Sequence, residues 1–152
     1  MFSLIITIIA VVLVIAIAAA AIFYGGDVFR GGSAKSHATA MVTACQQMGA
    51  AQSFYQASNA GAYADYTTLT TASNGYMSGP PSLPPGHVLA SIDTTTGVIT
   101  GSVSQAFPAS CDAINVLAGG TASAGIAKTA PAGAVFGCSG PGTAPYVFTF
   151  HE

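Results

Sequence analysis

The residues of this sequence best suited to catalysis or metal binding are its histidines, acids and cysteines. His37, His87 and His151 lie far apart in the sequence, and no carboxylate stands near them at the spacing of a metal site. Serines are frequent, but none lies in the Gly-x-Ser-x-Gly turn that exposes the nucleophile of many hydrolases. The sequence therefore predicts no enzyme, no bound metal and no cofactor.

Three acids are better explained by structure than by catalysis. Asp65, Asp93 and Asp112 stand in predicted turns or at a predicted helix start, where a carboxylate accepts hydrogen bonds from backbone N–H groups. The stretch GPGTAPY (140–146) lacks the lysine and the strand-loop-helix setting of a phosphate-binding loop. We therefore assign these residues to the scaffold.

The three cysteines divide into a distal pair and a single residue. If the chain is exported, Cys111 and Cys138 are expected to form a disulfide that closes a loop of about 28 residues and contributes about 3–4 kcal/mol. In a cytosolic chain the same two residues would be reduced structural thiols. Cys45 is expected to be a small buried apolar residue, with a link between molecules as the alternative.

Length and composition limit which elements can position these residues. A chain of 152 residues leaves room for one domain and an anchor. Its net charge is −2, only 5% of its residues are charged, and 51% are apolar. It has no cluster of Lys or Arg to neutralise phosphates, which argues against a nucleic-acid partner. Beyond the apolar start, the abundance of Ala, Gly, Ser and Thr is typical of a soluble domain packed with small side chains.

Residues 1–24, MFSLIITIIAVVLVIAIAAAAIFY, contain no charged residue and no histidine. About 20 apolar residues in a helix span the roughly 30 Å of a bilayer core. One interpretation is a secretory signal peptide, although a basic start is missing and the alanines at 18–21 only mimic a cleavage region. Another is a permanent membrane anchor. No basic residue precedes the segment, and only Arg30 and Lys35 follow it to set its orientation in the membrane. A third interpretation depends on the residues that come next.

A glycine-rich segment, GGDVFRGG, separates this run from a second helical pattern. From Ser33 on, small and apolar residues recur at spacings of three and four, which predicts an amphipathic helix. They are Ala34, Ala38, Met41, Val42, Cys45, Gly49, Gln52 and Tyr55. Each glycine in a helix costs up to about 1 kcal/mol relative to alanine, so the segment predicts a hinge where the helix melts or kinks. The hinge glycines are Gly25, Gly26, Gly31 and Gly32.

The chain after this helix predicts a small antiparallel sheet. In residues 87–103, apolar and polar side chains alternate on both sides of a turn sequence, Asp-Thr-Thr-Thr-Gly. This pattern is typical of two paired strands. Residues 108–120 predict a short helix with Ser110 as its N-cap and Gly119 as its stop. Two further strands are expected in 132–138 and 144–151. The fold class is therefore α+β, with a long N-terminal helix, apolar in its first half and interrupted by glycines, packed on a small antiparallel β-sheet.

In their order, three stretches resemble the type IV pilins. They are the apolar opening that leads into KSHATAMVTACQQMGAAQSFYQ, the Gly-x-Tyr stretch NAGAYADYTTL, and the ending from SCDAINVLAGG to FGCSGPGTAPYVFTF. In that family a very apolar helix first lies in the membrane and later forms the filament core. It continues into an amphipathic half packed on a C-terminal domain with a β-sheet. The ending is most similar to the type IVb branch, whose last pair of cysteines bounds a variable surface region.

Two departures from the pilin pattern bear on assembly. Pilins usually carry Glu at the fifth mature position, where it is thought to meet the N-terminal amine of the neighbouring subunit, whereas this chain has Ile5 and no acid before Asp27. The short basic leader that ends in Gly is also missing. If residue 1 is the mature N-terminus, Met1 fits the type IVb branch. If Met1 is the initiator, the chain is an unusual pilin or a pilin-like anchor.

The resemblance implies the structural subunit of an extracellular type IV pilus-like filament, a homo-oligomer whose subunits lie in the inner membrane before assembly. Its parts would be the apolar helix 1–24, the hinge 25–32 and the globular domain 33–152. The alternatives are a pseudopilin or minor pilin of a type II secretion or DNA-uptake system, and a membrane-anchored periplasmic binding or enzymatic domain. The residues expected to pack in the filament core are Phe2, Leu4, Ile5, Ile8, Ile9, Val12, Leu13, Ile15 and Ile17.

The hinge is expected to change with assembly. In a filament, part of 24–33 would be non-helical, so that each unwound residue rises about 3.3 Å instead of 1.5 Å. In the membrane the same segment would regain helix, because free backbone groups near lipid are costly. In the filament, Asp27 and Arg30 would lie where the core meets the heads and would pair with each other or across subunits, unless both are simply solvated.

Overall fold

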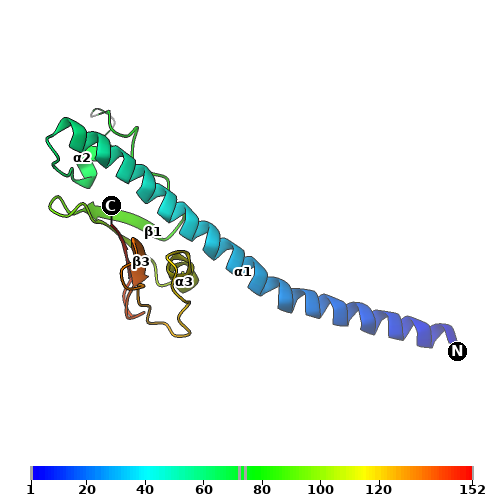
Figure 1. Ribbon diagram of the computed structural model, residues 1–152. Helices are drawn as coiled ribbons and strands as arrows, with labels where there is room; N and C mark the ends of the chain where they lie inside the picture. Colours follow the sequence, from blue (N-terminus) through cyan, green and yellow to red (C-terminus); the bar gives the residue numbers. More distant parts are fainter. Residues whose placement is uncertain (1, 72, 74, 152) are drawn as a thin grey trace. The chain divides into compact units, whose positions relative to one another are not determined.

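The computed structural model describes residues 2–71, 73 and 75–151, with only the backbone given for Phe2, Tyr24 and 27–30. The chain divides into two compact units, Met1–Ser33 and Ala34–Glu152, and we call the second unit the head. Helix α1 (Phe2–Ser58) contributes to both units (Figure 1). The other elements belong to the head and are α2 (Tyr66–Thr70), β1 (His87–Ile92), β2 (Ile99–Val103), α3 (Pro108–Leu117), β3 (Phe136–Ser139) and β4 (Tyr146–Phe150).

The backbone of α1 is helical through the glycine-rich segment 25–32, where the sequence predicts an interruption. A physical reason is that nucleation is the costly step of helix formation, and strong helical patterns on both sides leave only propagation across the glycines. The separate expectation, that 24–33 is partly non-helical in an assembled filament, stays a prediction. The expected pairing of Asp27 with Arg30 concerns side chains outside those that the structure describes.

The sheet of the head is antiparallel with the strand order β1-β2-β4-β3. The predicted hairpin in 87–103 is confirmed, with His87 opposite Val103 and Ile92 opposite Ile99. Its turn is held by Asp93, which accepts hydrogen bonds from the backbone N–H groups of Thr95 (2.7 Å) and Thr96 (3.4 Å). The two later strands are also confirmed, with shorter bounds than the sequence suggests. The α+β fold class is therefore as predicted.

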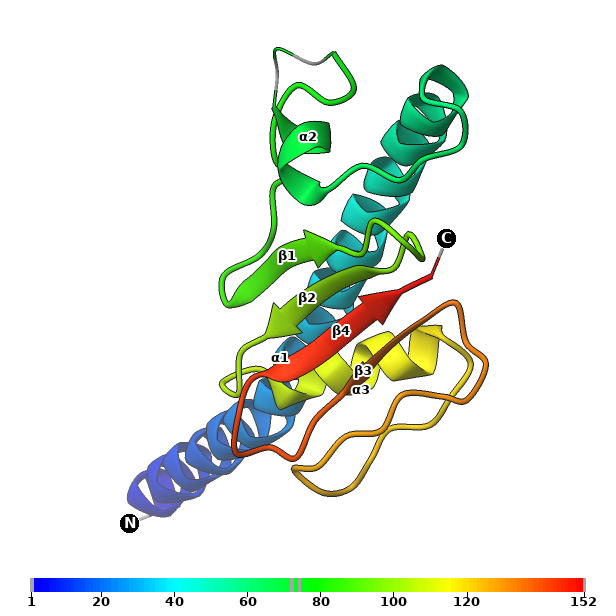
Figure 2. The ribbon, with the colours of Figure 1, turned by 90° about the vertical axis from the view of Figure 1, so that its left-hand side faces the viewer.

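Both α1 and α3 lie against one face of the sheet (Figure 2). Met41, Cys45 and Met48 of α1 are fully buried in the core that these elements share with the strands. Gly101 of β2 permits this close packing, since a Cβ there would lie 3.0 Å from the terminal methyl of Met41 and would overlap the carbonyl oxygen of Val88. The amphipathic pattern from Ser33 therefore does mark the face of α1 that packs on the sheet. The core side chains from the strands and α3 are Leu89, Ile92, Ile99, Val103, Cys111, Ile114, Cys138, Tyr146, Phe148 and Phe150.

The two short helices begin at residues with different capping chemistry. Asp65 caps α2, where its side chain accepts a hydrogen bond from the Thr68 N–H at 3.2 Å. Helix α3 begins with Phe107 as the N-cap and Pro108 in the first turn, so the prediction of Ser110 as N-cap is wrong. Proline fits the first helical position because its φ is preset and its missing N–H needs no partner. Gly119, with φ of +86°, follows the C-cap of α3 as predicted.

Candidate functional site

The segment Ser3–Phe23 of α1 is long and apolar enough to cross a membrane. It has 21 residues and a mean hydropathy of 3.2, and none of its most apolar window is buried. Its side chains are apolar all round the helix, which is typical of a helix covered on every side by lipid or protein. We call this segment the apolar helix.

The residues predicted to pack in a filament core are all exposed where their side chains are described. Their exposed fractions run from 53% for Ile5 to 66% for Leu4. The side chain of Phe2 lies outside the described ones. Several side chains that the prediction omits are as exposed, among them Ile6 and Val14 at 66% and 65%. Since the helix is apolar all round, hydropathy alone cannot choose one packing face.

The hydroxyl of Thr7, near the start of the apolar helix, is satisfied locally. The hydroxyl of Thr7 donates a hydrogen bond to the carbonyl oxygen of Ser3 at 2.5 Å. Such a bond to the preceding turn lets a threonine lie in an apolar setting without an unpaired donor. This hydroxyl therefore needs no partner from outside the helix.

Among the residues that the structure describes, no close packing explains the glycines of 25–32. A Cβ added to Gly25, Gly26, Gly31 or Gly32 would meet no heavy atom within 4 Å outside the neighbouring helix backbone. Alanine would fit these positions and would favour a helix by up to about 1 kcal/mol each. The reason for glycine therefore lies in backbone freedom or in contacts with other molecules.

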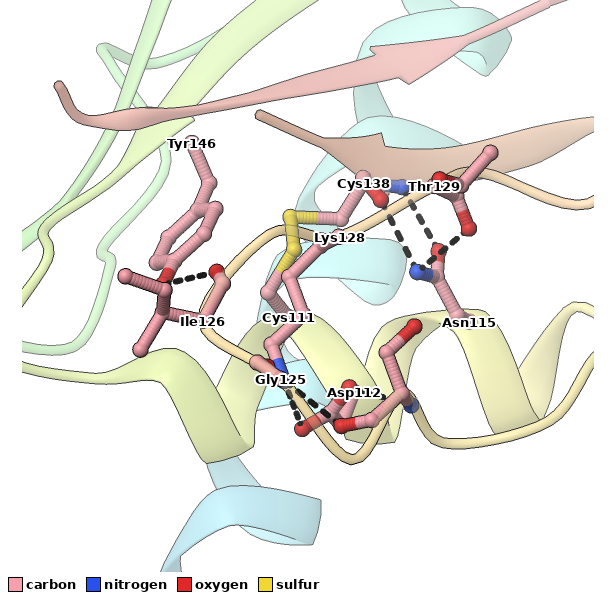
Figure 3. The surroundings of a disulfide bond; sticks show 10 residues. Cys111, Asp112, Asn115, Gly125, Ile126, Lys128, Thr129, Cys138 and Tyr146 are labelled. Atoms are coloured by element: carbon pink, nitrogen blue, oxygen red, sulfur yellow. Dashed lines mark hydrogen bonds and ion pairs between the residues drawn. A yellow bond between two sulfur atoms is a disulfide. The ribbon is translucent and has the colours of Figure 1, made fainter. Parts of the chain in front are cut away.

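The disulfide between Cys111 of α3 and Cys138 of β3 is formed (Figure 3). Cys45 is free and buried. The Cα atoms of the bonded cysteines are 5.4 Å apart, across 27 positions of sequence. Asn115, one turn after Cys111, is fully buried and holds the same strand. Its amide donates to the carbonyl oxygens of Cys138 (2.8 Å) and Thr129 (3.1 Å) and accepts from the Cys138 N–H (2.8 Å). A covalent bond and two hydrogen bonds thus fix α3 to β3, and the third hydrogen bond holds the preceding loop at Thr129.

The loop between α3 and β3 is held by a buried lysine. Lys128 donates from Nζ to the Asp112 carboxylate (2.6 Å) and to the carbonyl oxygens of Gly125 (2.8 Å) and Ser123 (3.0 Å). Its side chain is 3% exposed, and that of Asp112 is 21% exposed. All three N–H donors of the ammonium are therefore used. Asp112 serves the scaffold, as predicted. It does so from a position within α3, rather than at the helix start, through its ion pair with Lys128 of the loop.

Sequence reasoning missed Asn115, Lys128 and Tyr146, whose hydroxyl donates to the Ile126 carbonyl oxygen at 2.9 Å. A signal for Asn115 was its spacing of four from Cys111, which places both on one face of a helix. A signal for Lys128 was that a chain with only three basic residues places one of them between two cysteines. No local pattern points to Tyr146.

Two of the three histidines, which are far apart in the sequence, lie close together in the structure. The rings of His37 and His87 are in contact, with centroids 5.2 Å apart, whereas His151 follows the far end of β4. Among the described residues, no group of three or more His, Cys, Asp or Glu side chains could hold a metal ion. The hydrogen bonds from Thr68, and those from Thr95 and Thr96, lower the pKa values of the Asp65 and Asp93 carboxyls, as expected for acids that cap a helix and a turn.

Comparisons of the chain with protein-family models, with curated proteins and with solved structures found no match.

Proposed function

We propose that this chain is the structural subunit of an extracellular filament of the type IV pilus kind, assembled from identical copies through the apolar helix. The observation that supports this most is that Ser3–Phe23 is a long, wholly exposed apolar helix. Burying one large apolar side chain stabilises by about 1.5–3 kcal/mol relative to water. A segment with so many such side chains requires a cover that its own unit does not provide.

Two covers suit the apolar helix in turn. Before assembly the inner membrane covers it, since its length matches a bilayer core. After assembly the same segments of other subunits cover it. The exchange costs little because lipid chains and apolar side chains are similar solvents, and no charge in Ser3–Phe23 has to be moved out of water.

The head has features expected of an extracellular domain. Its disulfide is typical of proteins that fold in an oxidising compartment. Three of its acids serve the scaffold: Asp65 caps a helix, Asp93 holds a turn, and Asp112 pairs with Lys128. This composition favours a structural role over catalysis or ligand binding.

The glycines of 25–32 fit the same proposal. A permanent anchor needs no particular backbone freedom between membrane and domain, although it tolerates it. A subunit that leaves the membrane and packs among copies uses four glycines either to unwind the helix or to bring neighbouring helices close. The second use requires other molecules, and the space around these four positions, which is empty among the described residues, leaves room for them.

A leucine replacement separates a filament subunit from a membrane anchor. Residues 4–17 are replaced by leucine, which preserves the length and hydropathy that an anchor needs but removes the shapes that pack between subunits. We expect wild-type cells to release fibres on shearing, and the leucine variant to remain in the membrane fraction without fibres. Ile8→Leu is the matched control and should still assemble, because it conserves side-chain volume.

Two outcomes contradict the proposal. One is a wild-type chain that stays in the membrane as detergent-soluble particles and yields no fibres under any condition in which the head is folded. The other is fibres of unchanged symmetry from the leucine variant, which would mean that the apolar helix does not specify assembly.

A further inference from the structure

Three rings from distant parts of the sequence meet in the head near the beginning of β1. His37 lies on α1, and His87 is the first residue of β1; their ring planes are inclined by 73°. Phe107, the N-cap of α3, lies with its ring centroid 5.7 Å from each histidine ring. We call His37, His87 and Phe107 the three-ring cluster. It joins α1, β1 and α3 at one point.

The hydrogen bonds of the cluster assign a proton to one nitrogen of His87. Its Nδ1 lies 3.0 Å from the carbonyl oxygen of Pro85. A carbonyl only accepts, so Nδ1 carries the hydrogen and Nε2 carries the lone pair. Among the side chains that the structure describes, His87 Nε2 and His37 Nδ1 are buried without a hydrogen-bond partner. A second proton on His87 would therefore be added at Nε2, where no acceptor receives it.

The backbone around His87 is built to bring Phe107 against it. Gly86 has φ of +76°, and a Cβ there would lie 2.5 Å from the Phe107 ring. The carbonyl oxygen of Gly86 also accepts a hydrogen bond from the Ser104 N–H at 2.8 Å. Glycine at this position thus permits both the turn and the ring contact, and any other residue would displace Phe107.

We propose that the three-ring cluster is an acid-sensitive contact that holds the first turns of the head's part of α1 on the sheet and releases them in mildly acidic conditions. The proposal is independent of filament formation. Its basis is that both histidines pack against a phenyl ring, with their free nitrogens facing no acceptor, at the point where α1 begins to be buried. Ala34 and Ala38, on either side of His37, are 6% and 0% exposed.

The elements around the cluster bring no carboxylate to stabilise a charged imidazole. Segment 104–107 has no titratable residue, β2 has none, and β1 has only His87. The Asp112 carboxylate of α3 is already bound to Lys128. On α1, Lys35 has the same sign of charge as a protonated histidine, and Asp93 lies at the opposite end of β1. Among the described residues, therefore, a positive charge on the cluster gains no ion pair.

The pH range of the effect follows from linkage. Burial lowers the pKa of His87 below its usual value of 6.5. The Pro85 hydrogen bond opposes this with a smaller effect, and the charge of His37 adds a still smaller lowering. A lowered pKa means that the open state binds a proton that the closed state does not. The contact is therefore at full strength above about pH 6.5 and weakens as the pH falls below it. For one proton, the equilibrium constant for opening rises up to about tenfold per pH unit.

Hydrogen exchange of the full chain in detergent micelles tests the proposal. We expect amide protection in 37–41, 87–88 and 103–107, corrected for the intrinsic pH dependence of exchange, to fall by up to about tenfold per pH unit below about 6.5. Protection at the far end of the sheet, in 91–92 and 149–150, should remain constant. His87→Leu should abolish the pH dependence, and His151→Gln, which changes an exposed histidine, should retain it.

A measurement on the wild type keeps the proposal testable if His87→Leu does not fold. NMR titration of the imidazole carbons should show His87 charging below its usual pKa of about 6.5, together with the loss of protection. His87 titrating at its usual pKa, or protection that stays constant from pH 7.5 to 4.5, would overturn the proposal. So would an unchanged pH dependence in a folded His87→Leu chain.

Discussion

The two units of the chain treat their apolar side chains in opposite ways. In the head, Met41, Met48 and Phe148 are fully buried among side chains of the same unit. In the apolar helix, Leu4 and Ile6 are both 66% exposed. The head is thus stabilised by contacts within its own unit, whereas the apolar helix, on the proposed function, is stabilised by lipid or by other subunits around it. A substitution of the same chemical kind should consequently act on folding in one unit and on assembly in the other.

The head also shows what a small core of small side chains requires. Much of the α1 face that it buries is alanine, cysteine and glycine, which bury little apolar surface each. The disulfide, the Asn115 hydrogen bonds and the Lys128–Asp112 pair supplement that core on the α3 side. The apolar helix has no such cross-links among its described residues, and the proposed function assigns its cover to lipid or to other subunits.

The largest expected effect comes from a matched pair of truncations. Phe148→Ala should lower the free energy of unfolding of the head by about 3–5 kcal/mol, because it leaves a cavity in a fully buried site. Ile9→Ala removes a comparable apolar group from an exposed position and should leave head stability within about 0.5 kcal/mol. Denaturant unfolding of the full chain in micelles, followed by near-UV circular dichroism, measures both. Equal losses in the two variants would abolish the distinction between the units.

Removal of the disulfide should have the next largest effect. Cys111→Ala with Cys138→Ala should lower the free energy of unfolding by about 3–4 kcal/mol, chiefly because the unfolded chain gains entropy. Cys45→Ala is the control, with a smaller loss expected from a buried but unbonded residue. Denaturant titrations of the variants give these numbers.

Thiol labelling checks the pairing itself. Burial raises the pKa of Cys45 to about 12, so the native protein at pH 8 should react slowly with iodoacetamide. After unfolding without reductant, only Cys45 should be labelled. A labelled Cys138 in that sample would contradict the disulfide.

The smallest effect is expected from the removal of a single capping carboxylate in the head, that of Asp65. Asp65→Ala should destabilise the head by about 1 kcal/mol, because the Thr68 N–H at the start of α2 loses its acceptor. Asp65→Asn keeps an acceptor oxygen and should recover most of the loss. A loss well above 2 kcal/mol for Asp65→Ala would mean that α2 contributes more to the core than its length of five residues suggests.

Local patterns in the sequence predict most of the head. The alternation of apolar and polar residues in 87–103 predicts the hairpin, and two cysteines in neighbouring predicted elements suggest the disulfide. The N-terminus of α3 is mispredicted because a Ser cap at 110 and a Pro at 108 give competing signals, and proline prevails. The glycines of 25–32 suggest an interruption because propensity scales ignore the helical segments on both sides.

The remaining features depend on tertiary contacts that no local pattern encodes. The contact between His37 and His87 joins residues separated by 50 positions, and Tyr146 reaches Ile126 across 20. Only the register of the sheet and the packing of α1 bring such pairs together. In the apolar helix the limit is different, because an all-round apolar surface contains no information about which neighbour lies on which side.

A reconstruction of purified fibres at side-chain resolution tests the central claim most directly, namely that the apolar helix is covered by copies of itself. The account predicts that residues 3–23 lie in the centre of the fibre, each surrounded by the same segment of neighbouring subunits, with the heads outside. It also predicts a non-helical stretch within 24–33, whereas unbroken helix from 13 to 50 would refute the hinge alone. Fibres whose core excludes residues 3–23, or heads joined while this segment lies in detergent, would contradict the claim.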